Sequence, residues 1–140
     1  MKPVFQTTFK PELGPGAGNC HAACIASLLE LPLAEVPNFM EIIDDDERVR
    51  AETKWWARRG FCLLYVEDGS DLVGLGYHIA IGDSPRGDWL HEVIANGTAI
   101  IHDPRPEGGG LRNIQSRGVL VPLNPLPPAP RPPPQLPPTE

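Results

Sequence analysis

Residues 20–31 read CHAACIASLLEL, and this stretch decides the fold. It holds no Gly or Pro and is rich in Ala and Leu, which predicts a helix that begins after Asn19, the expected N-cap, and ends before Pro32. Apart from His21, no ionisable polar side chain occurs before Glu30. A helix that is apolar nearly all round is buried on most sides, so we expect this one at the centre of the fold.

A second helix and an antiparallel sheet are expected to follow. The acidic run of residues 41–47 leads into RVRAETKWWARRG, and acid at the start, base at the end and Gly60 just after are typical of a helix whose charged face is solvated. Apolar and alternating stretches predict strands at 61–67, 76–82, 91–95, 98–102 and 118–123. Pro122 places the last strand at a sheet edge. Helices first and then an antiparallel sheet is an α+β pattern.

The chain divides into one domain and a tail. Ten of the eighteen prolines lie in residues 122–140. Residues 124–140 (NPLPPAPRPPPQLPPTE) therefore predict an extended polyproline-type tail, which is a spacer or a docking segment. Residues 1–123 have the length and apolar content of a single domain.

Charge and cysteine content narrow the function classes. The net charge is −6, which argues against a nucleic-acid partner, because phosphate binding needs a basic surface. No stretch approaches the roughly 20 apolar residues of a membrane span, and residues 1–6 hold no apolar run suited to secretion. Three cysteines do not suggest a disulfide framework. We expect a cytoplasmic protein with free thiols.

Cys20 is the candidate nucleophile. It occupies the first position of the predicted helix, where free backbone N–H groups and the positive end of the helix dipole favour a thiolate. The same N–H groups can stabilise an oxyanion. Cys24 and Cys62 fit the usual role of a cysteine as a small buried apolar residue.

Four histidines are candidate bases for this thiol. The side chain of His21 points about 100° away from that of Cys20 on the helix. His78 lies in the middle of a predicted strand. His91 opens a strand after a polar loop, which is the usual place for a base, and His102 ends the strand that returns from the hairpin. We therefore select His91.

The Asn-Gly turn at residues 96–97 leaves two hairpin registers open. A two-residue turn places His91 opposite His102. A three-residue turn that includes Thr98 places His91 opposite Asp103, so that an imidazole and a carboxylate lie side by side on one face.

GNCHAACIASLLE (residues 18–30) and HEVIANGTAIIHDP (residues 91–104) resemble the papain-like cysteine peptidase superfamily, and are nearest to its small bacterial branch of bacteriocin-exporter peptidase domains. The resemblance spans residues 4–123. It implies a papain-like fold, with the buried cysteine helix packed on a small antiparallel sheet. It also implies a Cys-His-Asp triad in which Cys20 is the nucleophile, His91 the base and Asp103 the orienting carboxylate. Gln6 and the Cys20 N–H would complete the oxyanion hole, although Gln6 precedes Cys20 by fourteen residues rather than about six.

The expected function is thiol-dependent hydrolysis of a protein, a peptide or another amide through a covalent thioester, without metal or cofactor. Two alternatives remain. One is a non-catalytic binding module of papain-like shape. The other is a zinc-binding domain that uses Cys20, Cys24, His91 and His102, which lacks a Cys-x-x-Cys pair.

Overall fold

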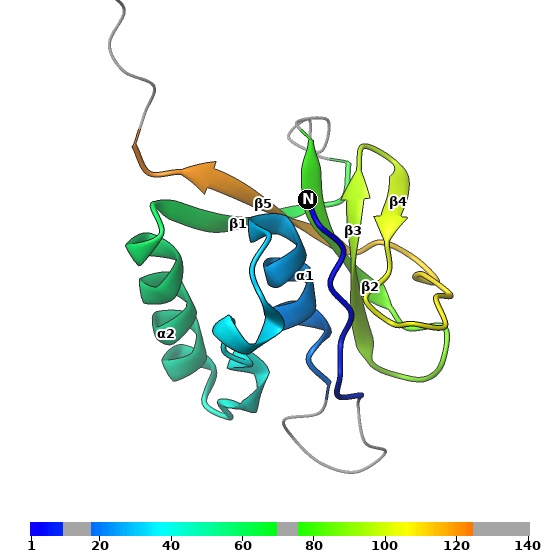
Figure 1. Cartoon of the computed structure of the whole chain (residues 1–140). Helices are drawn as coiled ribbons and strands as arrows, with labels where there is room; N and C mark the ends of the chain where they lie inside the picture. The colour runs from blue at the N-terminus through cyan, green and yellow to red at the C-terminus, as the bar shows by residue number, and fades with distance from the viewer. Residues whose placement is uncertain (10–17, 70–75, 125–140) are drawn as a thin grey trace, which may run out of the picture.

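The computed structural model describes residues 1–9, 18–69 and 76–124 (Figure 1). The predicted tail, from residue 125 on, lies outside the described residues. Two α-helices and two short 3-10 helices precede five strands, which confirms the expected α+β order. In chain order the elements are α1 (Cys20–Leu29), η1 (Leu33–Glu35), η2 (Phe39–Glu41), α2 (Asp45–Arg58), β1 (Phe61–Glu67), β2 (Tyr77–Asp83), β3 (Leu90–Asn96), β4 (Ala99–His102) and β5 (Ser116–Pro122).

Helix α1 is the buried helix that its composition predicts. Every residue from His21 to Ser27 is buried. The helix ends two residues earlier than expected, because Glu30 adopts a left-handed conformation with φ of 56°. From there the backbone N–H of Leu31 returns to the carbonyl of Ala26, which satisfies one of the last free carbonyl groups of the helix.

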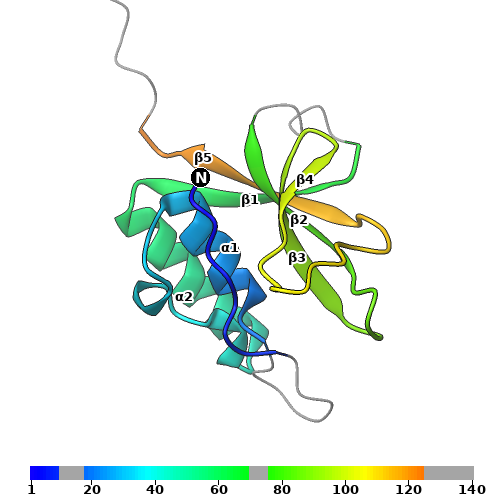
Figure 2. The same cartoon turned by 45° about the vertical axis from the view of Figure 1, so that its right-hand side comes forward.

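Helix α2 packs against strand β1 and lies beside α1 (Figures 1 and 2). The Asp44 side chain caps it by accepting a hydrogen bond from the backbone N–H of Glu47 at 2.8 Å. Trp56 is its one buried side chain, at 1% exposure, while the adjacent Trp55 is partly buried. The Trp56 ring packs edge-on against Phe61 of β1, with the ring centroids 6.5 Å apart.

The five strands form one antiparallel sheet in the order β1-β5-β2-β3-β4. Strand β5 lies between β1 and β2, so the prediction that Pro122 marks an edge strand is wrong. Proline is tolerated because β2 pairs only with residues 116–118, at the other end of β5. On that flank Pro122 therefore needs no backbone donor for a ladder.

The hairpin between β3 and β4 has neither of the two expected registers. Asn96 pairs with Ala99, so the turn consists of residues 97–98. Its first residue is a glycine with φ of 60°, a conformation that favours glycine in tight hairpin turns. A bulge then shifts the pairing and sets Ile94 opposite His102.

The sheet carries apolar side chains on both faces. On the helix side Ile79, Ile81 and Ile94 pack in one cluster with α1, η2 and α2. On the other side Ala80, Val93 and Ala95 pack with Leu111 and Ile114, which follow β4 in the chain. Of the helices described in this chain, none is long and apolar enough to cross a membrane.

Candidate active site

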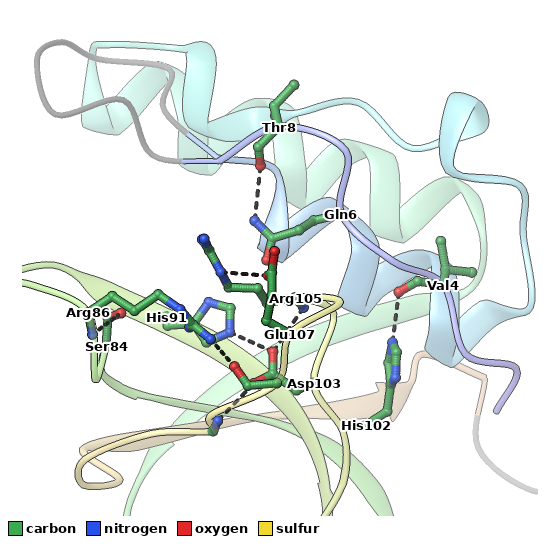
Figure 3. A network of polar contacts seen from close by, with 12 residues as sticks. Val4, Gln6, Thr8, Ser84, Arg86, His91, His102, Asp103, Arg105 and Glu107 are labelled. Atoms are coloured by element: carbon green, nitrogen blue, oxygen red, sulfur yellow. Dashed lines mark hydrogen bonds and ion pairs between the residues drawn. The ribbon is translucent and has the colours of Figure 1, made fainter.

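His91 and Asp103 form a hydrogen-bonded pair at the end of the β3-β4 hairpin (Figure 3). The His91 Nε2 and Asp103 Oδ1 atoms are 2.8 Å apart, and the two side chains are 6% and 10% exposed. Asp103 follows β4 directly and lies beyond the ladder, so the side chains meet although the expected three-residue turn is absent. In the part of the chain that the structure describes, Nδ1 of His91 makes no hydrogen bond, which leaves this nitrogen available to a reacting group.

The carboxylate of Asp103 is fixed by the turn that follows it. Its Oδ1 accepts the backbone N–H of Arg105 at 2.9 Å, and its Oδ2 accepts the backbone N–H of Gly110 at 2.8 Å. Burial opposes ionisation, but the hydrogen bonds from His91 and from these two N–H groups hold the pKa of Asp103 below its usual value. Asp103 is therefore a charged, rigid acceptor that sets the orientation of the imidazole ring.

Cys20 opens α1 as predicted, and it is partly buried. Burial raises the pKa of its thiol to about 12, and the charge of Glu92 adds to this rise. Backbone N–H groups of Glu92, His21 and Cys20 itself lower the pKa in part. The N–H groups at the helix start thus lower the pKa of the thiol, as expected, but burial raises it by more. Without a positive charge nearby, the thiol is therefore protonated at neutral pH.

Cys20 and His91 come from different elements and lie close in the fold. The backbone N–H of Glu92 faces the Cys20 sulfur, and Glu92 directly follows His91 on β3. No hydrogen bond joins the Cys20 thiol to His91 among the described residues. The structure therefore brings the thiol to the strand that carries the imidazole, whereas it joins His91 and Asp103 directly.

Gln6 lies beside the His91–Asp103 pair (Figure 3). Its backbone N–H donates to the carbonyl of Pro104 at 2.9 Å. The side chain is buried, with Nε2 donating to the carbonyl of Thr8 at 2.9 Å. Its Oε1 atom has no hydrogen-bond partner within the described residues. An unpaired buried amide oxygen is costly and calls for an explanation, and a catalytic role is one such explanation.

Asn19 connects the segment of residues 1–9 to the start of α1. Its Oδ1 accepts the backbone N–H groups of Thr7 and Thr8, both at 2.9 Å, and its Nδ2 donates to the Thr7 hydroxyl at 3.0 Å. Asn19 is the N-cap residue of α1, as predicted, and its carbonyl accepts the backbone N–H of Ala23 at 3.0 Å. Its side chain makes no capping bond, because it is engaged by the first segment. Since Asn19 precedes Cys20, these bonds hold the segment that carries Gln6 at the start of α1, although Gln6 precedes Cys20 by fourteen residues.

The other two strand histidines have partners away from this pair. The His102 Nε2 bonds the carbonyl of Val4 at 2.8 Å (Figure 3). The His102 ring also stacks edge-on with Phe5. His78 is buried and lies between the Gly76 carbonyl and the Arg117 guanidinium, at 2.9 and 2.7 Å. Each of these two rings therefore bonds to a group other than Cys20 or Asp103.

Sequence reasoning missed a buried charged triad next to Cys20. The His21 Nδ1 is 2.6 Å from a Glu92 carboxylate oxygen, and its Nε2 is 2.7 Å from a Glu52 carboxylate oxygen. Burial opposes the charge on His21, yet the two carboxylates raise its pKa to about 10. Glu52 was expected on a solvated helix face, but it accepts hydrogen bonds from His21 and from the Trp56 indole N–H. The sequence held one indication of this triad: Glu92 is the single acidic residue in the apolar strand HEVIA, which suggests a buried partner.

The residues of the zinc alternative do not form a metal site. Among the described residues, no group of three or more His, Cys, Asp or Glu side chains is placed to hold a metal ion. Cys24 is fully buried within α1, and His102 is bound to Val4.

No protein-family model, curated protein or solved structure matches this chain. The fold and the site define an α+β protein in which a helix-initiating thiol, a histidine–carboxylate pair and a buried glutamine come together. A histidine held by a carboxylate can transfer protons, a thiol can attack a carbonyl, and N–H groups at a helix start can stabilise an oxyanion.

Proposed function

We propose that this chain is a papain-like thiol hydrolase that cleaves an amide bond through a Cys20 thioester. The observation that carries the proposal is the His91–Asp103 hydrogen bond, with Asp103 held by two backbone N–H groups. Such a pair orients one imidazole nitrogen and leaves the other free for proton transfer. The position of Cys20 at the start of α1 and the burial of Gln6 beside the pair support the same assignment.

The proposed reaction has two halves, acylation of Cys20 and hydrolysis of the resulting thioester. In each half His91 first takes a proton and then returns it. His91 Nδ1 takes the Cys20 proton before the sulfur attacks the carbonyl carbon, and the oxyanion is stabilised by the Cys20 N–H and the Gln6 side-chain amide. Collapse breaks the C–N bond, and His91 returns the proton to the departing amine. Water then attacks the thioester while His91 takes its proton. The acid product leaves, and the thiol is restored with that proton.

The raised pKa of Cys20 places a condition on this proposal. A buried thiolate needs a compensating positive charge, and protonated His91 is the cation that the site can supply. We therefore assign the reactive state to a Cys20 thiolate and His91 imidazolium ion pair, formed when the thiol proton moves to Nδ1. The same raised pKa favours the second candidate, a non-catalytic binding module in which Cys20 stays protonated.

The substrate class that suits these groups is a protein, a peptide or another amide, and acyl transfer is possible where an amine replaces water. The mechanism requires no cofactor. All three cysteines are free thiols, and a reducing compartment such as the cytoplasm would keep the nucleophile active. We assign residues 1–123 to the catalytic domain and leave residues 124–140 as an appended spacer or docking segment.

Acylation by p-nitrophenyl acetate separates the two candidates. The exposed Cys62 is first replaced by serine, so that it does not consume the reagent. A hydrolase should release a burst of p-nitrophenol and gain one acetyl group on Cys20 by intact mass. It should then lose that group with time. Cys20→Ala in the same background should show neither effect. If both proteins react at the same slow rate, the hydrolase proposal fails and the binding-module candidate stands.

A further inference from the structure

A pocket of about 280 Å³ lies between α2 and β1, away from the His91–Asp103 pair. Trp56, Phe61 and Tyr65 contribute aromatic rings to its wall. Val49 and Leu123 line it as well and are among the most exposed large apolar side chains, at 61% and 51%. The volume is just below the range of roughly 300–1,000 Å³ that is typical of ligand sites, so it suits a small molecule.

One carboxylate lines this apolar pocket, and it belongs to Glu52 of the buried triad. Its Oε1 atom accepts both the His21 Nε2 and the Trp56 indole N–H. Its Oε2 atom accepts no hydrogen bond from any residue that the structure describes. This second oxygen is the charged acceptor of a pocket whose lining also includes the hydroxyl-bearing Thr53 and Tyr65.

The triad carries one uncompensated negative charge. His21 supplies one positive charge between the two carboxylates of Glu52 and Glu92. Arg48 attracts Glu52, but its guanidinium is bound to Asp45 and to the carbonyl of Ile42. The other titratable groups that face the triad are neutral, because burial and these carboxylates raise the pKa values of the Tyr65 hydroxyl and the Cys20 thiol.

We propose that this pocket binds a small organic monocation, an ammonium group on an aromatic or branched alkyl body. The ammonium would donate to Glu52 Oε2 and balance the triad, and the apolar body would fill the space against Trp56, Phe61 and Tyr65. Aromatic walls favour such a ligand further, because ring faces attract cations. A neutral molecule of the same shape leaves the excess charge unbalanced and therefore binds less tightly. This inference goes beyond the hydrolase proposal and does not depend on it.

An NMR titration with benzylammonium chloride tests the site, with benzyl alcohol at the same pH 7 and ionic strength as the matched neutral probe. We expect benzylammonium to shift the Trp56 indole N–H and the backbone amides of Thr53 and Ala57, which also line the pocket. Its affinity should exceed that of benzyl alcohol by at least tenfold. Equal affinity of the two probes would overturn the proposal. So would shifts confined to the acidic run at residues 44–47.

Two variants locate the effect. Glu52→Gln should remove the preference for benzylammonium, since it removes the charge and keeps the shape of the side chain. Ala57→Trp fills the pocket from an exposed helix position and leaves the triad intact, so it should abolish binding of both probes. If Glu52→Gln does not fold, the Ala57→Trp variant still tests where the probes bind, and the comparison of the two probes still tests whether the site prefers a cation. Unchanged binding to Ala57→Trp would overturn the site.

Discussion

At the scale of single residues, His21 shows how a fully buried charge is kept in this fold. The imidazole lies between two carboxylates at 2.6 and 2.7 Å, from different elements, and so joins α1 to both α2 and β3. Removal of one member of such a buried group costs about 3–5 kcal/mol, because the remaining charges lose their partner. The residue after Cys20 therefore helps to fix the start of α1 against the strand that carries His91.

The first prediction is a pH dependence of stability caused by His21. Its pKa is about 10 in the folded protein and near 6.5 in the unfolded chain, so the stabilisation is complete below pH 6.5 and is lost as the pH rises towards 10. Urea unfolding should show a free energy that falls between pH 6.5 and 8.5 with a slope of up to about 1.4 kcal/mol per pH unit.

His21→Gln is the control for this slope. The variant should be less stable at pH 6.5 and nearly independent of pH across the window. Two other kinds of group change the free energy of unfolding outside this pH range. His78, whose pKa is lowered by burial, contributes below pH 6.5, and the buried thiols contribute above pH 8.5. A slope that persists in His21→Gln would assign the effect to another group.

The second prediction concerns Asp103. Asp103→Asn keeps the shape of the side chain but removes the charge that holds the His91 ring, so the ion pair with Cys20 can form only in a less favourable orientation. Alkylation of Cys20 by iodoacetamide at pH 6 should slow by roughly tenfold, less than the loss of 100-fold or more for removal of the base itself. An Asp103→Asn rate equal to that of the native protein would mean that the carboxylate is only structural.

At the scale of elements, residues 1–9 are held both to α1 and to the end of β4, where His102 and Pro104 bond to Val4 and Gln6. The backbone N–H of Lys2 donates to the Ser27 carbonyl at 3.0 Å, and Val4 donates to the Ser27 hydroxyl at 2.9 Å. Further along, Asn19 accepts the backbone N–H groups of Thr7 and Thr8. The segment therefore places Gln6 between the helix start and the end of β4.

The third prediction tests this attachment. Asn19→Ala should lower the free energy of unfolding by about 1–3 kcal/mol, because the backbone N–H groups of Thr7 and Thr8 lose their acceptor and each such hydrogen bond contributes about 0.5–1.5 kcal/mol. It should also slow acylation of Cys20, because Gln6 is no longer held in place. Asn19→Asp keeps an oxygen acceptor and should restore most of the stability in urea unfolding. If Asn19→Ala weakens stability but leaves acylation unchanged, Gln6 has no part in the oxyanion site.

The sequence predicted helix and strand positions better than it predicted their pairing. Helix α1 was recognisable because its apolar side chains cover the circumference, and α2 because its charges follow the helix dipole. The position of β5 and the hairpin register were wrong, since local proline and turn preferences do not report which strands become neighbours. Glu52 was missed for a similar reason: in RVRAETKWWARRG it is one charge among many, and only the fold shows that it faces His21.

At the scale of the whole molecule, the described residues form two apolar clusters, one on each face of the sheet. The two apolar clusters draw on the helices, the strands and the segment after β4. Strand β5 ends at Pro122, and the segment beyond it is almost entirely proline and polar residues. Such a composition does not form a core of its own.

The fourth prediction follows from this division. Deletion of residues 126–140 should change the melting temperature by less than about 2 °C, because 1 kcal/mol corresponds to roughly 4–8 °C in a domain of this size. Differential scanning calorimetry of the full and shortened chains measures the change. A fall of more than about 5 °C would show that the tail packs on the domain.

The central claim, that His91 activates Cys20, is tested most directly by the pH dependence of Cys20 alkylation. The rate is measured by peptide mapping from pH 5 to 10 in the native protein, in His91→Ala and in His102→Ala as the matched control. We predict rapid labelling of Cys20 at pH 6 in the native protein and in His102→Ala, and its loss in His91→Ala, since the imidazolium that stabilises the thiolate is gone. If all three proteins label Cys20 only at strongly alkaline pH, as an isolated buried thiol would, or if His102→Ala removes the reaction at pH 6 while His91→Ala does not, the claim is contradicted.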